Sequence, residues 1–210
     1  MGDGKEPFVK KKLGILGGSF DPIHQGHLNI AQRAYEQFGL DGVWFIPAGH
    51  SPNKNEKEMT PADMRAEMVA LAIQDIPHFS LSTMEIDSSE VSYTYLTLTR
   101  LKERYPDVTL YFIMGADSLD YFEQWYHPEI ICQKAVLLTA VRDDLDMAAV
   151  RQKIAHVKRL FPAEIYPIAG AKTDISSSFL REAVSKSMAA EGMLPKKVEE
   201  YIRMHHLYGT

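Results

Sequence analysis

The 210-residue chain has a single cysteine, Cys132, so no disulfide can form within it. Its hydrophobic stretches are short, and none approaches the roughly 20 residues that a helix needs to cross a bilayer. The first twelve residues lack the apolar centre of a signal peptide, and we expect residues 1–12 to be a flexible leader. From these absences we expect a cytoplasmic protein with no membrane partner.

Basic charge is also scarce, since 23 Lys and Arg stand against 28 Asp and Glu, for a formal net charge of −5. A chain whose main partner is a nucleic-acid backbone usually carries an excess of positive charge, so we expect no nucleic-acid partner. The dinucleotide fingerprint G-x-G-x-x-G is absent, as are a zinc signature and a catalytic triad. Cys132 has no Cys or His at ligand spacing, and we expect no protein-bound metal site.

What the chain does have is a hydrophobic content of 45%, enough for one sizeable core. Apolar runs that predict strands lie near 13–17, 42–46, 79–83, 108–114, 135–140 and 164–168. Helical patterns lie between them near 26–38, 61–75, 92–105 and 146–159. This alternation predicts an α/β fold, a Rossmann-like doubly wound parallel sheet with helices on both faces. We expect one domain over 13–210, with a small C-terminal helical subdomain over about 175–210.

The segment from Gly17 to His27 reads Gly-Gly-Ser-Phe-Asp-Pro-Ile-His-Gln-Gly-His. Gly17 and Gly18 permit a sharp turn after the first strand, and a helix begins near Gly26. The N–H groups at a helix start attract anions, and His24 and His27 lie beside that end. Imidazole donates hydrogen bonds to phosphate oxygens, so the segment predicts a phosphate site. From the spacing alone, the two histidines could also be ordinary polar surface residues or part of a metal site.

A second segment, from Ile175 to Arg181, reads Ile-Ser-Ser-Ser-Phe-Leu-Arg and opens another helical pattern. Serines at a helix start cap its N–H groups, and the same geometry binds phosphate. Arg181 lies one turn further on and offers a two-pronged donor. Alone, the segment would indicate a serine cap with a surface arginine.

Other segments carry weaker signals. Gly115-Ala116-Asp117 follows a predicted strand end, where ligands bind in such sheets. Ser92-Tyr93-Thr94 and Trp125-Tyr126 offer hydroxyl donors and an aromatic wall, although in isolation they equally indicate a helix cap and packing. Lys54 lies in a polar loop over 47–61, where a long basic side chain could reach a triphosphate, although composition alone favours a solvated loop.

The first segment resembles the GG-(S/T)-FDP-x-H-x-GH signature of the HxGH nucleotidyltransferase superfamily, and within it the bacterial nicotinate-nucleotide adenylyltransferases. The second resembles that family's I-S-S-(S/T)-x-(I/L)-R motif. Phosphopantetheine adenylyltransferases and glycerol-phosphate cytidylyltransferases usually carry Thr at the position of His24. The family loop Pro-Pro-His-Lys corresponds to Ser51-Pro52-Asn53-Lys54, so Lys54 matches while Asn53 replaces the His. The resemblance covers residues 13–208.

The resemblance implies adenylyl transfer from ATP, with Mg²⁺, to nicotinate mononucleotide, giving nicotinate adenine dinucleotide and pyrophosphate in NAD biosynthesis. The attack is expected to be direct and in line, without a covalent intermediate. The implied catalytic residues are His24 and His27. The implied ATP-binding residues are Gly17, Gly18, Ser19, Phe20, His24, His27, Lys54, Gly115, Asp117, Ser177, Ser178 and Arg181. The implied acceptor-binding residues are Tyr93, Thr94 and Trp125, with Tyr93 acting through its backbone.

Three alternatives stay open at this point. The acceptor is nicotinamide mononucleotide or another phosphorylated molecule, the chain is a nucleotide-binding regulator without turnover, or it has a role linked to nucleic acid. His24, His27 and Arg181 argue against a regulator, because a non-catalytic module has no need of all three. The acidic balance argues against nucleic acid. A homo-oligomer also stays open.

Overall fold

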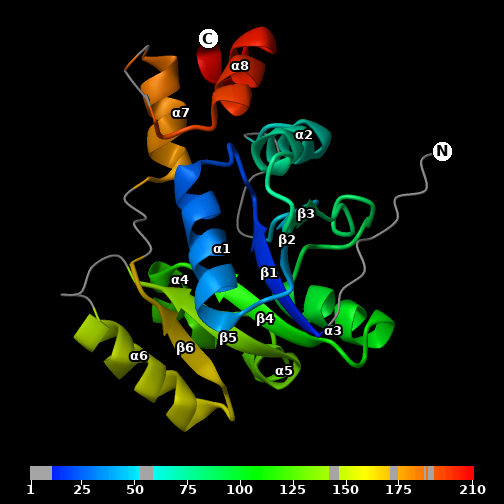
Figure 1. Cartoon of the computed structure of the whole chain (residues 1–210), viewed down its shortest axis with the longest axis vertical. Coiled ribbons are helices and arrows are strands. Elements are labelled where there is room, and N and C mark those ends of the chain that lie inside the picture. The colour runs from blue at the N-terminus through cyan, green and yellow to red at the C-terminus, as the bar shows by residue number, and fades with distance from the viewer. Residues whose placement is uncertain (1–10, 53–58, 142–146, 171–174, 187, 189–191) are drawn as a thin grey trace.

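The computed structural model describes residues 11–52, 59–141, 147–170, 175–186, 188 and 192–210 (Figure 1). Within this part of the chain six strands form one sheet in the order β3-β2-β1-β4-β5-β6. The strands are β1 (Lys12–Gly18), β2 (Gly42–Pro47), β3 (Phe79–Leu81), β4 (Thr109–Met114), β5 (Ala135–Ala140) and β6 (Ile165–Ile168). Every neighbouring pair is parallel. The predicted doubly wound parallel sheet is confirmed, and strand order reverses between β1 and β4.

Eight α-helices surround the sheet in the described residues. They are α1 (Gln25–Phe38), α2 (Ala62–Ile73), α3 (Thr94–Arg104), α4 (Ala116–Asp120), α5 (Pro128–Lys134), α6 (Met147–Leu160), α7 (Ser177–Ser185) and α8 (Lys196–Met204). Two 3₁₀ helices, η2 (Phe122–Gln124) and η4 (Leu207–Gly209), complete the set. None of the described helices has the length and apolarity that a membrane span requires.

The helices divide between the two faces of the sheet. One buried cluster joins the sheet to side chains of α1, α2, α7 and α8, and a second joins it to α3, α4, α5 and α6. In Figure 1, α1 crosses the front of the sheet, and α2, α7 and α8 gather near the end where β1 finishes. Helices on both faces were predicted. The expected C-terminal helical part consists of α7, α8 and η4, and Leu180 and Tyr201 join the core of the first face.

β1 is buried on both faces, which the central strand of a parallel sheet requires. Leu13 and Ile15 belong to one buried cluster and Leu16 to the other. The strand begins at Lys12, one residue earlier than its apolar run predicts, because Lys12 pairs with Thr109 of β4. The backbone N–H groups of Lys11 and Lys12 both donate to Oδ2 of Asp41 at 2.9 Å. The remainder of the expected leader, residues 1–10, lies outside the described residues.

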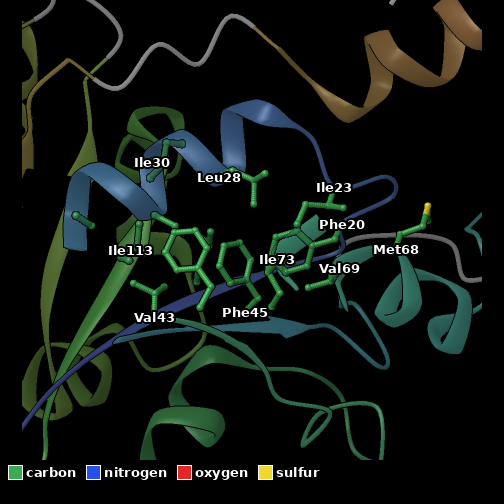
Figure 2. Close-up of a cluster of buried hydrophobic side chains, with 14 of the residues drawn as sticks. Phe20, Ile23, Leu28, Ile30, Val43, Phe45, Met68, Val69, Ile73 and Ile113 are labelled. Carbon is green, nitrogen blue, oxygen red and sulfur yellow. The ribbon is translucent and has the colours of Figure 1, made fainter. Parts of the chain in front are cut away.

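The loop that follows β1 is anchored by apolar side chains. Figure 2 shows Phe20 and Ile23 among Phe45, Val69 and other core residues, where they are 1% and 0% exposed. Burying each such side chain contributes about 1.5–3 kcal/mol. The backbone between β1 and α1 is therefore held from below by the core, although it lies at the rim of the sheet.

Candidate active site

The two histidines meet at the start of α1. His24 is the N-cap residue with an extended backbone, and its N–H donates to Nδ1 of His27 at 3.2 Å. Because Nδ1 of His27 accepts this bond, the neutral ring carries its proton on Nε2. The local backbone therefore sets the His27 tautomer.

The two rings are stacked, with centroids 3.7 Å apart and an interplanar angle of 30°. The Phe20 ring meets His27 edge-on at 5.0 Å. His24 is only 5% exposed, and its Nδ1 has no hydrogen-bond partner among the described residues. Burial lowers the pKa of His24 to about 4, so this imidazole is neutral near pH 7.

Gly26 makes room for the His24 ring. A Cβ at this position would lie 3.0 Å from both Cε1 and Nδ1 of His24, closer than ordinary van der Waals contact. The glycine between the two histidines therefore lets the first imidazole lie against the helix backbone.

The two predicted phosphate segments contact each other at Asp21 and Pro22. Nη1 of Arg181 donates to the Asp21 carbonyl at 2.8 Å, and Oγ of Ser177 donates to the Pro22 carbonyl at 3.0 Å. The cap of α7 is Ser176, whose Oγ accepts from the Phe179 N–H at 3.2 Å. Ser177 and Ser178 therefore do not cap the helix, and Nη2 of Arg181 donates to Oγ of Ser178, one turn earlier on α7, at 3.5 Å.

A buried cation, Arg65 on α2, supports the same loop and was not predicted. It is 2% exposed, and its guanidinium donates to the carbonyls of Ser19 at 2.6 Å, Ala48 at 2.7 Å and Thr60 at 2.9 Å. Burial lowers the pKa of Arg65, while the nearby Asp21 carboxylate opposes that shift. The sequence did carry a signal for this residue, because Arg65 lies on the apolar stripe of α2. An arginine at such a position is buried and therefore needs several hydrogen-bond partners.

A cavity of about 720 Å³ opens at the carboxyl ends of β1, β2 and β4. This is the crevice where ligands bind in a doubly wound sheet, beside the reversal of strand order. The predicted residues that line it are Gly17, Gly18, Ser19, Tyr93, Thr94 and Trp125. The sharp turn predicted at Gly17 and Gly18 is wrong, because β1 continues through both glycines, which pair with β2, and within residues 17–27 the backbone takes a positive φ, of 49°, only at Phe20. The structure nevertheless brings these two glycines and the predicted acceptor residues to one cavity.

Trp125 forms an aromatic wall of this cavity. Its ring packs against Phe122 at 5.5 Å and against Phe112 edge-on at 6.0 Å, so core aromatics fix its orientation. The start of α3 provides another part of the cavity wall, and its N-cap residue, Tyr93, makes no side-chain capping bond. The first turn of α3, with Thr94, therefore brings helix N–H groups to the cavity wall.

Ser92, one of the hydroxyl donors that the sequence suggested, also lines the cavity, as does Glu85, which the sequence did not suggest. Oγ of Ser92 accepts from the Gly49 N–H at 3.0 Å, and Glu85 accepts from Oγ1 of Thr97 at 2.6 Å. Burial raises the pKa of Glu85. A Cβ on Gly49 would lie 2.2 Å from the Glu85 carbonyl, so only glycine fits between these two walls.

The remaining predicted residues lie outside the lining of this cavity. They include Phe20, His24, His27, Ser177, Ser178 and Arg181. Gly115 is the N-cap residue of α4 and Asp117 lies in its first turn, just past β4. Lys54 lies outside the described residues.

Metal ligands are not grouped in this site. Over the described ranges, no set of three or more His, Cys, Asp or Glu side chains is arranged to hold an ion. Cys132 is buried, and burial raises its pKa to about 11, so it is a protonated thiol near neutral pH.

The fold and the site define a nucleotidyltransferase with a Rossmann-like sheet, and a family model described as cytidylyltransferase-like matches residues 15–183. A relative from Lachnoclostridium phytofermentans, named probable nicotinate-nucleotide adenylyltransferase, is 39% identical over 94% of this chain and 99% of its own. A relative of the same name from Bacillus cytotoxicus is 35% identical over 94% and 98%. The chain therefore belongs to the nicotinate-nucleotide adenylyltransferase family, as its motifs predicted.

Solved structures agree with this fold. The nicotinic acid mononucleotide adenylyltransferase of Plasmodium falciparum, complexed with APC, has a TM-score of 0.75 at 22% identity, covering 95% of this chain and 98% of that one. A putative nicotinate-nucleotide adenylyltransferase from Vibrio parahaemolyticus has a TM-score of 0.67 at 19% identity, over 95% and 96%. At these identities the likeness concerns the fold alone.

Proposed function

We propose that the protein transfers the adenylyl group of ATP to nicotinate mononucleotide, forming nicotinate adenine dinucleotide and releasing pyrophosphate. The observation that carries this proposal is the 720 Å³ cavity, because Gly17 and Gly18, which open the histidine motif, line it together with Thr94 and Trp125. The names of the curated relatives support it.

The reaction is a single displacement at phosphorus. A phosphate oxygen of the mononucleotide forms a bond to the α-phosphorus of ATP, and the bond from that phosphorus to the oxygen bridging the α- and β-phosphates breaks. Pyrophosphate leaves with the electron pair. Since both substrates are anionic, the protein contributes alignment and neutralisation of charge.

His27 is the proposed donor to the α-phosphate. Its Nδ1 is held by the His24 N–H, so Nε2–H is the hydrogen-bond donor in the neutral ring. His24, neutral and buried beneath the second ring, supports the same position. The N-terminus of α1 adds a favourable dipole. Its Gln25 N–H already donates to the Met193 carbonyl at 2.9 Å, and the His27 and Leu28 N–H groups donate to the His24 carbonyl.

The departing pyrophosphate is assigned to Ser177, Ser178 and Arg181. The Arg181 guanidinium lies at the carbonyl of Asp21, so it is held beside the histidine loop. Lys54 is the fourth proposed ligand, from the family motif. Gly115 and Asp117 follow β4 at the same edge of the sheet, which supports the adenosine side for them.

The acceptor is proposed to place its pyridine ring against Trp125 and its carboxylate toward the first turn of α3. A helix N-terminus favours an anion over a neutral amide. The absence of a side-chain cap at Tyr93 supports this placement, because the Thr94 end of the helix faces the cavity. The same reasoning predicts nicotinate over nicotinamide.

Mg²⁺ is proposed to enter as part of the substrate, bound to ATP. The ion prefers phosphate oxygens and water to an all-protein cage. The lack of a ligand cluster in the described part of the chain is consistent with a metal that ATP carries.

Pyrophosphate release with Mg·ATP tests the proposal when nicotinate mononucleotide, nicotinamide mononucleotide and phosphopantetheine are compared at matched concentrations. We expect the highest kcat/KM with nicotinate mononucleotide. Faster turnover of another acceptor would keep the phosphate site and overturn the pyridine assignment. No turnover with any of the three would overturn the proposed reaction.

A further inference from the structure

A tyrosine far along the chain reaches the histidine loop. Tyr208 lies in η4, and its hydroxyl donates to Oδ1 of Asp21 at 2.6 Å, across 187 positions of sequence. Oγ1 of Thr60 donates to the same hydroxyl at 3.2 Å. Burial raises the pKa of Tyr208, so the phenol keeps the proton that it donates.

Asp21 is the residue on which the supports of the loop converge. It is 2% exposed, and besides Tyr208 its carboxylate accepts from the Thr60 N–H at 3.4 Å. Its carbonyl accepts from Arg181 at 2.8 Å, and Arg65 holds the carbonyl of Ser19 two residues earlier. The side chain of Asp21 is thus held by Tyr208, and its backbone carbonyl is held by Arg181.

The Tyr208 backbone conformation indicates that this contact is maintained against a cost. The residue has φ 58° and ψ 24°, the left-handed region that a tyrosine seldom adopts. Such conformations cost about 1–3 kcal/mol and persist where the surrounding structure fixes them. Here the fixing contacts are η4 against α7 and α8, and the hydroxyl against Asp21.

We propose that Tyr208 is a positioning residue for adenylyl transfer: its hydroxyl holds the Asp21 carboxylate, and with it the loop that places Arg181 beside the two histidines. The proposal rests on the phosphate roles assigned above. Removing the hydroxyl leaves Oδ1 of a buried carboxylate without its donor, which the loop relieves by moving. A displacement of about 1 Å near reacting groups costs on the order of 100-fold in rate.

The test is a comparison of Tyr208→Phe with Tyr201→Phe. Tyr201, on α8, donates to Oε2 of Glu67 on α2 at 2.8 Å, so the control removes a similar tyrosine–carboxylate bond that does not touch the loop. In Tyr208→Phe we expect kcat to fall roughly 10- to 100-fold and the KM for ATP to rise. The KM for nicotinate mononucleotide should stay at the wild-type value, because the acceptor cavity has its own walls. Tyr201→Phe should keep both KM values and kcat within about twofold.

Three other kinetic outcomes would overturn the proposal. Wild-type kinetics in Tyr208→Phe would overturn the proposal, as would an equal loss in Tyr201→Phe, which would indicate general loosening of the C-terminal helices. A lower kcat with both KM values unchanged and an equal loss of the folded fraction would also overturn it. Thermal denaturation of both variants measures that fraction. A wild-type protein without turnover of nicotinate mononucleotide would instead contradict the proposed function, so the two failures are distinguishable.

Discussion

The His24 and His27 rings are stacked, yet they differ in their contact with water. His24 is buried, whereas His27 is half-buried and is held through Nδ1 by the backbone of its neighbour. The pair therefore consists of an imidazole fixed in its neutral form and a second one whose Nε2–H is directed by the first.

The His27→Ala substitution tests whether the His27 imidazole is the donor to the α-phosphate. Removing a transition-state donor typically costs on the order of 10²–10³ in turnover, so we expect a loss of that size in kcat. The half-buried position means that the thermal unfolding midpoint should change little. His156→Ala is the matched control, since His156 lies on α6 in an exposed pair with Glu123 and should leave kcat unchanged. Near-normal turnover in a folded His27→Ala protein would remove His27 from the reaction.

The depressed pKa of His24 predicts a specific loss of stability in acid. Between its ordinary value of 6.5 and about 4, the unfolded chain binds a proton that the folded protein excludes. The contribution is therefore complete above about pH 6.5 and is lost as the pH falls toward 4. From the size of the shift, the decrease is at most about 3 kcal/mol.

Denaturant unfolding of the wild type and of His24→Gln across this pH range measures the effect. The free energy of unfolding should fall more steeply with acid in the wild type than in the variant. Parallel pH profiles for the two proteins would show that His24 does not titrate with the predicted pKa.

The sequence was informative about some residues of the site and silent about others. Gly17, Gly18, Thr94 and Trp125 could be grouped by motif, and they do line one cavity. Arg65 and Tyr208 could not, because what matters is which carbonyl or carboxylate each one reaches, and those partners lie 46 and 187 positions away. Local pattern carries no information on such contacts.

At the scale of elements, the start of α1 is shaped by Gly26 against the preference of a helix. Alanine is a better helix former than glycine by about 1 kcal/mol, yet an alanine Cβ would press on the His24 ring. Helix α1 is therefore less stable with Gly26 than it would be with alanine, but the glycine leaves room for the His24 imidazole.

Gly26→Ala should therefore lower kcat at least tenfold, by roughly the cost of a displaced catalytic group, without lowering the thermal unfolding midpoint. Steady-state kinetics and thermal denaturation of the same preparation measure both effects. Arg33→Ala, on the exposed face of α1, controls for a change to the helix itself. If Gly26→Ala kept wild-type kcat, the His24 ring position would not matter for turnover.

The contact of α7 with the β1–α1 loop predicts the behaviour of Arg181. A hydrogen bond to a charged group contributes about 1.5–3 kcal/mol, so Arg181→Ala should raise the KM for ATP roughly tenfold or more. Arg203, exposed on α8, provides a control substitution to alanine. An unchanged KM for ATP together with intact kcat would remove Arg181 from the site.

At the scale of the whole molecule, the alternation of apolar and amphipathic stretches was enough to predict a parallel sheet with helices on both faces. All six strands lie where their apolar runs indicated, because buried parallel strands need continuous hydrophobic sequence. The short helix α5 was not predicted, since 7 residues are too few for a clear helical period. The strand order, with β1 between β2 and β4, likewise depends on contacts that periodicity does not encode.

The most important functional claim is that the cavity between Gly17–Gly18 and Trp125 receives the acceptor. The chain has two tryptophans, and Trp44 is 3% exposed in the core and does not line the cavity, so the fluorescence of Trp125 reports on the cavity. Titration with nicotinate mononucleotide is expected to quench the wild type and Trp44→Phe, and to leave Trp125→Phe unchanged at a saturating concentration. Quenching of wild-type size in Trp125→Phe would contradict the account, because the acceptor would then bind away from this cavity.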